Sequence, residues 1–366
     1  MQGIHRSLLR RIQSWTHYHH TTTVLLVGIG ILLATAMVAG VLLYQSPKSV
    51  SVPKLATVKK PAPSVPAPVY YSPLTGEKVP DQASTQQAVT GIMIENSPDA
   101  RPQSGLKAAG VVYEAIAEGG ITRFLTLFQQ EKPQLVGPVR SVRLYYVDWV
   151  APFQASIAHV GGSKFALNEV RNGNYRDLDQ FFNSGSYWRA TDRYAPHNVY
   201  TSFAKLDALN AKKGYATSTF TSWPRKDGAA VKTPNASNIN VTISGALYNS
   251  HYQYVAATNN YLRFEGGAAH NDRELGQIAP TTIIVMDTVM KLIFEDGYRE
   301  QITTTGSGHA RVFQDGTVTE ATWTKKDRGS QISFTEAATG KEIPLNRGQT
   351  WITAVPANQG GKVTWQ

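Results

Sequence analysis

The chain is 366 residues long, which is too long for one compact core and enough for roughly two domains. It carries 36 Lys and Arg against 26 Asp and Glu, a formal net charge of +10 at pH 7. Seven of the basic residues and none of the acidic ones lie within residues 1–69, which leaves 29 basic against 26 acidic side chains elsewhere. Because a nucleic-acid binder would carry its basic excess on the folded part, this distribution argues against nucleic acid as a partner.

The sequence contains no cysteine. This excludes disulfides, thiolate metal sites and cysteine nucleophiles. The fold must therefore be held by core packing alone, for which a chain with 42% hydrophobic residues has sufficient material. No motif for a cofactor is present, and we expect none to be bound.

The segment from Val24 to Tyr44 contains no charged residue. A helix of this length spans about 30 Å, the thickness of a bilayer's hydrocarbon core. Three arginines precede it, so the positive-inside rule places residues 1–23 in the cytoplasm and the following chain outside. A cleaved signal peptide, with Ala34 to Ala36 as the cleavage site, is the alternative, but the apolar run exceeds the usual ~7–15 residues. We therefore expect a single-pass membrane anchor.

Residues 45–70 are rich in proline, lysine and alanine. Such a segment cannot bury a core, and its prolines favour an extended spacer of about 3.1 Å per residue. The segment is therefore either a semi-rigid spacer that holds the globular body away from the bilayer or a flexible tether with no set length.

Strand and helix patterns alternate through residues 71–215, which predicts a mixed α/β domain. Two apolar runs flank Glu118-Gly119-Gly120 and indicate a hairpin. Pro138 is typical of a first helical residue and predicts a helix that continues to about Val150. The other expected elements are strands over 89–95 and 155–160, a helix from near Ser163, and a helix capped at Thr201 or Ser202 that ends at Lys212.

Residues 216–237 read as an irregular connection, and residues 238–358 as a second, β-rich domain. Asn259-Asn260 separates two alternating runs and indicates a hairpin. Residues 281–289 form a continuous β-branched run that is typical of a central strand. The expected fold class is α+β: a mixed α/β lobe followed by a mainly antiparallel β lobe, behind one transmembrane helix.

Several phrases of this sequence resemble the YerB-like lipoprotein family, a bacterial two-domain family of unknown activity. The resemblance implies an N-terminal and a C-terminal domain in the cell envelope, and no particular reaction. The anchor departs from the family pattern, because the chain has no lipobox cysteine and offers a transmembrane helix instead. The matching phrases are PLTG at 73–76, IMIEN at 92–96, ARPQSGL at 100–106, VVYEAIAEGGITRF at 111–124, GPVRSVR at 137–143, HVGGS at 159–163, APHNVY at 195–200 and RGQTWI at 347–352.

The segment GPVRSVR is the first candidate for binding chemistry. If a helix opens at Pro138, Arg140 and Arg143 share a face beside unpaired backbone N–H groups, which suits a carboxylate or phosphate. The alternative is that the arginines pair internally with Glu114, Glu118 or Asp148.

The segment HVGGS is the second candidate. Backbone amides in its glycine turn can cradle an anion, and His159 can act as an acid or base. The competing interpretation is that the glycines permit a tight turn and that Ser163 caps a helix.

These patterns lead to one functional hypothesis, a polar cleft in the first domain that accepts an anionic cell-wall or glycan ligand. A hydrolase of wall or glycan material, using Glu118, His159 and His197, is the alternative. On one strand Glu114 and Glu118 would share a face about 13 Å apart, too far for a two-carboxylate glycosidase. The body contains no two closely spaced histidines of the kind that bind a metal, so we expect no metal site. The expected ligand-binding residues are Arg101, Arg123, Arg140, Ser141, Arg143, His159, Gly161, Gly162, His197 and Asn198.

Overall fold

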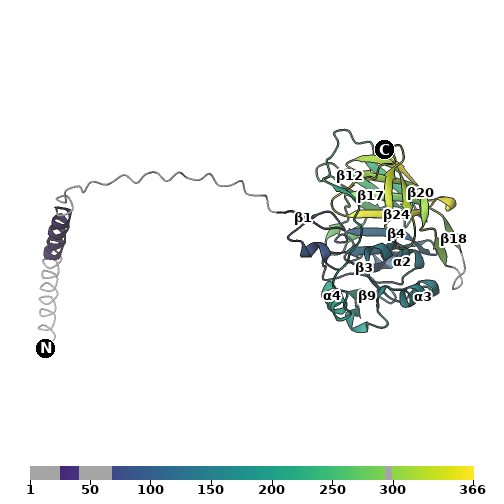
Figure 1. The fold of residues 1–366 in the computed structure, drawn as a ribbon, viewed down its shortest axis with the longest axis horizontal. Helices are drawn as coiled ribbons and strands as arrows, with labels where there is room; N and C mark the ends of the chain where they lie inside the picture. The colour runs from purple at the N-terminus through teal and green to yellow at the C-terminus, as the bar shows by residue number, and fades with distance from the viewer. Residues whose placement is uncertain (1–24, 41–67, 293–298) are drawn as a thin grey trace, which may run out of the picture. The chain divides into compact units, whose positions relative to one another are not determined.

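The computed structural model describes residues 25–40, 68–292 and 299–366 (Figure 1). The chain divides into two units, Met1–Pro66 and Ala67–Gln366. In the first unit, residues 25–40 form a helix with exposed side chains. No helix among the described residues is both long enough and apolar enough to cross a membrane. The remainder of the expected anchor and residues 1–23 and 45–67 lie outside the described residues.

One ten-stranded sheet runs through the whole second unit, and each half of the sequence contributes five of its strands. The order is β22-β21-β20-β17-β24-β4-β5-β3-β6-β7. The strands are β3 (Thr90–Glu95), β4 (Val111–Glu118), β5 (Ile121–Phe128), β6 (Ser156–His159), β7 (Arg176–Asp179), β17 (Thr282–Thr288), β20 (Gly306–Gln314), β21 (Thr317–Lys325), β22 (Ser333–Glu336) and β24 (Thr350–Pro356).

Strand β24 joins the two halves, because it pairs in parallel with β17 on one side and β4 on the other. Strands β3, β6 and β7 are also parallel, and β5 is antiparallel to both β3 and β4. Strand β21 has the same direction, because it is antiparallel to β20, which is antiparallel to β17. Seven strands of this sheet therefore share one direction and end at the same edge. This carboxyl edge, defined by the last residues of β7, β6, β3 and β4, carries Asp179, His159, Glu95 and Glu118.

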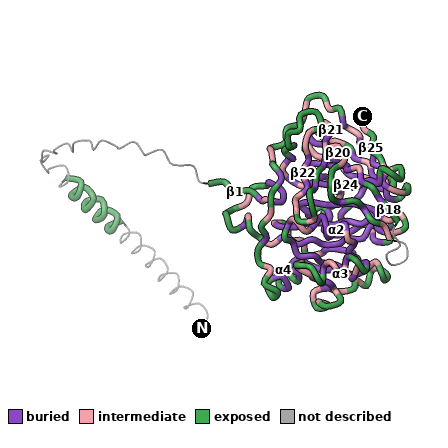
Figure 2. The backbone as a smooth tube through the Cα atoms, turned by 45° about the vertical axis from the view of Figure 1, so that its right-hand side comes forward, coloured by how far each residue is buried: buried purple, intermediate pink, exposed green. Residues whose placement is uncertain are grey.

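Both faces of the sheet are covered. Trp149 of α2 stacks on Tyr113 of β4, with ring centroids 5.3 Å apart, and α3 packs against α2 and β7. On the opposite face Phe203 of α4 meets Phe128 at 5.0 Å. Figure 2 shows the resulting buried centre beneath exposed loops. The helices are α2 (Leu144–Val150), α3 (Lys164–Asn172) and α4 (Phe203–Lys212).

A five-stranded sheet in the order β14-β13-β12-β11-β25 packs on the second face, where Arg263 of β13 meets Glu114 of β4. Its strands are β11 (Asn238–Thr242), β12 (Ser250–Val255), β13 (Asn260–Glu265), β14 (Ala268–Ala269) and β25 (Lys362–Trp365). The short pairs are β1 (Tyr70–Tyr71) with β2 (Lys78–Val79), β8 (Tyr187–Arg189) with β9 (Val199–Thr201), β10 (Arg225–Lys226) with β23 (Leu345–Asn346), β15 (Asn271–Asp272) with β16 (Gly276–Gln277), and β18 (Met290–Leu292) with β19 (Glu300–Ile302). The 3-10 turns are η1 (Ala83–Gln86), η2 (Pro98–Ala100), η3 (Ala151–Phe153), η4 (Ser184–Ser186) and η5 (Ala357–Gln359).

The fold class expected for the body is confirmed, with a mixed α/β first half and a mainly β second half. Ser163 caps α3 as predicted, and Ser202 is the cap of α4 among the two predicted candidates Thr201 and Ser202. The helix expected from Pro138 is wrong, since α2 begins at Leu144.

The reason lies in the segment before α2, where residues 137–143 run extended. The amide of Val139 donates to Val199, that of Arg140 to Met93 and that of Val142 to Gly161, at 2.7–3.0 Å. Buried valines at every third position resemble a helical stripe, but these tertiary hydrogen bonds satisfy the backbone without a helix.

A buried ion-pair network lies between the two halves, centred on Arg263 of β13. Its Nη2 lies 3.1 Å from Glu114 Oε1 and 3.2 Å from Glu265 Oε1. Its Nε donates to His270 Nδ1 at 2.9 Å and its Nη1 to the Tyr252 hydroxyl at 2.7 Å. All five side chains are buried.

The network extends into the ten-stranded sheet through Glu114 of β4. Its second oxygen accepts a hydrogen bond from Trp351 Nε1 at 2.9 Å, and the Trp351 ring lies 4.4 Å from the Arg263 guanidinium. Burial raises the pKa of Glu265 to about 7, because the attraction of Arg263 only partly offsets the lost hydration. One guanidinium thus serves a carboxylate from each half.

We predict that Arg263→Ala lowers the free energy of unfolding by about 3–5 kcal/mol, because it leaves two buried carboxylates without their shared cation. Urea unfolding of the purified chain would measure this change. The control is Lys212→Ala, on the exposed end of α4, which should stay within about 0.5 kcal/mol. Equal stability of both variants would contradict the role given to Arg263.

Candidate functional site

Three arginines converge on Glu118 at the carboxyl edge. Glu118 lies 3.6 Å from Arg123 and 3.2 Å from Arg299, and it forms a close ion pair with Arg143. A β-bulge between Ile116 and Glu118 aids this placement. Glu118 therefore faces these arginines, whereas Glu114 faces Arg263, so the expectation that the two glutamates share a strand face is wrong.

The electrostatics of this cluster favour an additional negative charge. Burial raises the pKa of Glu118, but the three arginines outweigh it and hold that pKa below its usual value. Burial and the neighbouring charge of Arg143 lower the pKa of Arg123 to about 10. Crowded cations with one carboxylate among them are stabilised by any further anion that approaches.

A pocket of about 550 Å³ opens beside this cluster. We call it the arginine pocket, after its cationic lining residues Arg143, Lys291, Arg299 and Arg328. Its volume lies within the usual range for small-molecule sites.

The acidic side chains of the arginine pocket are Asp148 and Glu300. Asp148 is engaged by Arg328 at 2.5 Å and by the Thr304 hydroxyl at 2.6 Å. Further hydroxyls come from Ser163 and Thr303. Cations combined with hydroxyl groups are the donors that carboxylates and phosphates require.

A second cluster surrounds Glu95, the last residue of β3. His197 Nδ1 lies 3.0 Å and Arg140 Nε 3.3 Å from Glu95 Oε1, and the other carboxylate oxygen is buried without a hydrogen bond in the described residues. Ser97 Oγ contacts the same His197 nitrogen at 3.1 Å. A Ser–His–Glu relay needs its serine and its carboxylate on opposite ring nitrogens, so this cluster is not such a triad.

A third cluster surrounds His159, the last residue of β6, which is fully buried. Its Nδ1 lies 2.8 Å from the Gly161 carbonyl and its Nε2 3.0 Å from Asp177. Burial raises the pKa of Asp177, but the interactions with His159, the Asp179 amide and Arg171 together outweigh it and lower that pKa. Gly161 has a φ of +59°, and a Cβ on Gly162 would collide with Val142. These glycines therefore serve a tight turn.

The predicted ligand-binding residues are thus divided among separate places. Arg123 and Arg143 meet at Glu118, and Ser141 supplies a backbone carbonyl that accepts from Arg123 at 2.8 Å. Arg101 bonds Asn96 and lies 3.5 Å from Glu265 in the network between the halves. Asn198 accepts from Arg189 in its own loop.

Several polar residues at these clusters were absent from the sequence prediction. Glu95 ends an apolar strand at the carboxyl edge, and that position was a usable signal. No signal in the sequence indicates that Arg299 and Arg328 belong to this site, because both lie more than 150 residues from Arg143 along the chain. Both ring nitrogens of His270 are engaged by protein side chains, Nδ1 by Arg263 and Nε2 by Gln103, so neither is placed to bind a metal ion. Within the described ranges no group of three His, Asp or Glu is arranged to hold a metal ion.

The fold is therefore a two-part α/β protein joined by one sheet, with a basic pocket at the carboxyl edge. The chain belongs to the family described as "Protein of unknown function (DUF3048)", whose N-terminal domain matches residues 74–216 and whose C-terminal domain matches residues 239–352.

One relative is "Putative lipoprotein YerB" of Bacillus subtilis (strain 168). It is 35% identical over 293 residues, which cover 78% of this chain and 86% of the relative. The crystal structure of the Bacillus subtilis YerB protein matches with a TM-score of 0.71 and 32% identity. That match covers 81% of this chain and 99% of the crystallised chain.

We predict that Glu118→Gln destabilises the protein by about 2 kcal/mol in chloride buffer, because the three arginines lose their shared carboxylate. Added phosphate should restore more stability to this variant than to the unchanged protein, since an anion can replace the lost charge. Thermal unfolding with and without phosphate would measure both effects. Glu131→Gln, at an exposed position, is the control. An equal response to phosphate in all three proteins would contradict the assignment.

Proposed function

We propose that this protein is a membrane-anchored component of the cell envelope that binds an anionic envelope ligand, a wall polymer or glycan, in the arginine pocket. The observation that carries the proposal is the convergence of Arg123, Arg143 and Arg299 on one carboxylate beside a hollow of about 550 Å³. Arg143 and Arg299 line that hollow, so a ligand inside it reaches both guanidinium groups.

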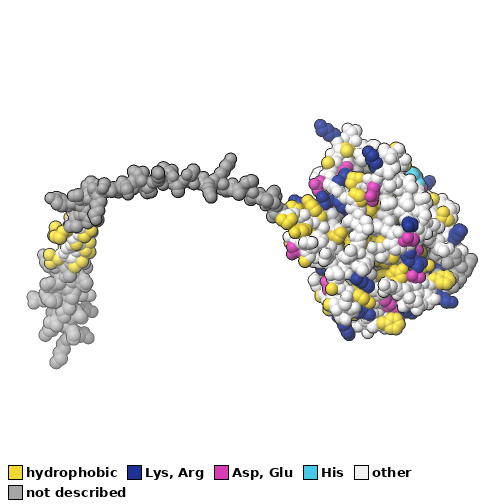
Figure 3. All heavy atoms as spheres, viewed as in Figure 1, with side chains coloured by type: hydrophobic (Ala, Val, Ile, Leu, Met, Phe, Trp, Pro, Cys, Tyr) yellow, Lys and Arg dark blue, Asp and Glu magenta, His cyan; other side chains and the backbone are white. Residues whose placement is uncertain are grey.

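The location of the pocket supports this function. It lies near the carboxyl ends of β4 and β6, where the turn to Ser163 opens α3, and carboxyl ends of parallel strands are favoured ligand sites in α/β folds. Figure 3 shows Lys and Arg interspersed with Asp and Glu over the face in view. A local basic hollow on an otherwise mixed surface favours a specific anion over general adhesion to polyanions.

The anchor is part of the proposal. It rests on the uncharged run from Val24 to Tyr44, of which residues 25–40 are helical. A relative described as a lipoprotein supports attachment to a membrane. In this topology residues 1–23 remain in the cytoplasm and the body from residue 71 onward lies outside.

The geometry favours binding over hydrolysis. Glu118, His159 and His197 belong to three different clusters, and each is engaged by protein partners. His159 is fully buried and cannot meet a substrate. A general base must approach the proton that it removes within hydrogen-bond reach, together with the other reacting groups.

We predict that the full chain, purified in detergent, is retained on isolated cell wall bearing anionic polymer, and that Arg143→Ala with Arg299→Ala weakens retention at least tenfold. Retention should fall as salt rises, because the attraction is electrostatic. Co-sedimentation at several salt concentrations would measure it. Lys212→Ala with Lys213→Ala removes the same charge from the end of α4 and should have little effect. Unchanged retention of the arginine variant would refute the pocket.

We predict that alkaline phosphatase fused to the C-terminus is active in cells, because this enzyme matures only outside the cytoplasm. Deletion of residues 24–44 should abolish that activity while leaving the fusion protein expressed. A cytoplasmic fluorescent reporter at the same position provides the reciprocal measurement. Activity restricted to the cytoplasmic reporter would overturn the topology, independently of the pocket.

A further inference from the structure

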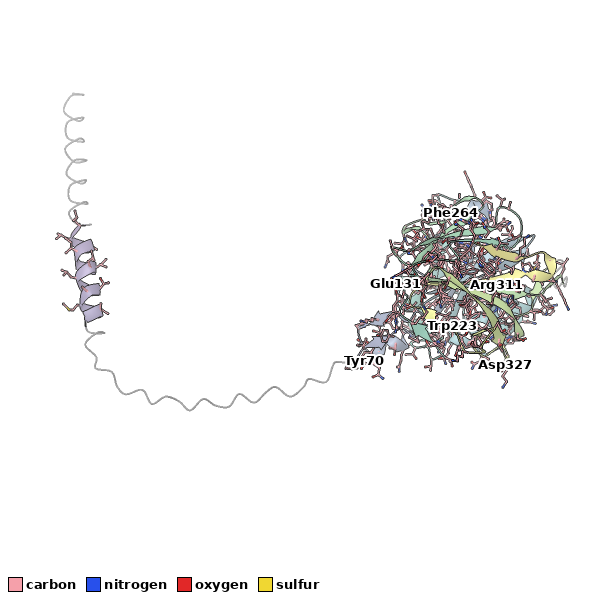
Figure 4. The ribbon with its side chains drawn as sticks, turned by 90° about the horizontal axis from the view of Figure 1, so that it is seen from above. Tyr70, Glu131, Trp223, Phe264, Arg311 and Asp327 are labelled. Atoms are coloured by element: carbon pink, nitrogen blue, oxygen red, sulfur yellow. The ribbon has the colours of Figure 1, made fainter. Side chains whose placement is uncertain are left out.

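Two hollows of about 400 and 320 Å³ adjoin on the surface of the body, and both are lined by Leu135. We call the two hollows together the hairpin groove. The larger one is lined by residues of the β8–β9 hairpin, and both are lined by residues of the turn between β15 and β16. Figure 4 labels Glu131, which lines the groove, at the left of the body, and Asp327, next to Arg328 of the arginine pocket, at the lower right. The groove and the arginine pocket are therefore separate sites.

Aromatic side chains form one wall of the groove. Trp188 of β8 and Tyr200 of β9 stand directly opposite each other in the hairpin, so both side chains lie on the same face, and both line the larger hollow. Trp188 is half-buried, whereas the Tyr200 ring is fully buried and packs on Gly137. An aromatic plane accessible in a groove is suited to stacking.

The Tyr200 hydroxyl is buried beside Arg273, which acts on it both as a cation and as a hydrogen-bond partner. Burial raises the pKa of this phenol, and Arg193 and Arg273 offset part of that effect. Tyr200 therefore supports Arg273, and the groups of this wall that a ligand can reach are Trp188, Asp192 and Arg273.

Planar polar groups complete the larger hollow. Arg273 Nη2 lies 2.7 Å from Asp192 Oδ2, and both side chains remain more than a third exposed. Arg189 adds a second exposed guanidinium. Carboxylate and guanidinium groups in one plane can each bond two neighbouring hydroxyls of a ligand.

We propose that the hairpin groove is a carbohydrate-binding site for a neutral oligosaccharide. A sugar ring stacks its C–H face on Trp188, and its hydroxyls bond the exposed side chains of Asp192 and Arg273. The adjoining hollow extends the site along the chain of rings. A neutral ligand follows from the balanced charge of the groove, which contrasts with the basic arginine pocket. The site goes beyond the proposed function and does not require the arginine pocket to bind anything.

The test uses the full chain in detergent and tetra-N-acetylglucosamine, a neutral oligosaccharide, with maltotetraose as a second probe. We expect saturable heat of binding in calorimetry for at least one probe, and a change in tryptophan fluorescence. Trp188→Ala should weaken binding at least tenfold and Trp188→Phe by less, because phenylalanine keeps an aromatic face. Asp192→Ala should weaken it about three- to tenfold, because the ligand's hydroxyls lose their charged acceptor.

The variants also separate this site from the anion site. Arg143→Ala with Arg299→Ala should leave the affinity for the neutral probes unchanged. Absence of binding by both probes would overturn the proposal, as would affinities of Trp188→Ala and Asp192→Ala equal to that of the unchanged protein. Loss of binding in the arginine variant alone would assign sugar to the arginine pocket and would likewise overturn it. If Trp188→Ala unfolds, Asp192→Ala at its exposed position decides.

Discussion

The architecture depends on the charge of Arg263, which is fully buried and has carboxylate partners from both halves of the chain. A buried guanidinium is costly unless its donors are paired. Glu114 of β4 is therefore fixed relative to β13, and Trp351 of β24 bonds the same glutamate. This constraint favours the register in which β24 lies beside β4, since a shift of one residue would turn Glu114 away from Arg263.

That junction has consequences for the carboxyl edge. With β24 between β17 and β4, strands from both halves run in the same direction and end together. Strand β19 of the pair β18–β19, which follows β17, then lies against β4 and α2. The arginine pocket arises where these segments meet, and neither half could form it alone.

The pocket also illustrates a balance between stability and binding. Glu118 neutralises part of the charge of Arg123, Arg143 and Arg299 and so stabilises the protein without ligand. Three guanidinium groups share this single carboxylate, so the cluster itself keeps a net positive charge that attracts an anion. The hairpin groove has a different character, since its cations Arg273 and Lys132 are paired with Asp192 and Asp207 and its aromatic wall provides stacking.

Local patterns in the sequence were sufficient to predict the β4–β5 hairpin, the caps at Ser163 and Ser202, and the β-rich second half, because propensity and turn chemistry act over a few residues. The helix from Pro138 failed because tertiary hydrogen bonds, invisible in the sequence, hold residues 137–143 extended. Arg123 and Arg143 were found as candidates, but their partner Arg299 was not. The sequence by itself determined the family, the elements and the residue types available for binding. Only the tertiary structure decided which of them meet, because strand order brings together side chains that are far apart along the chain.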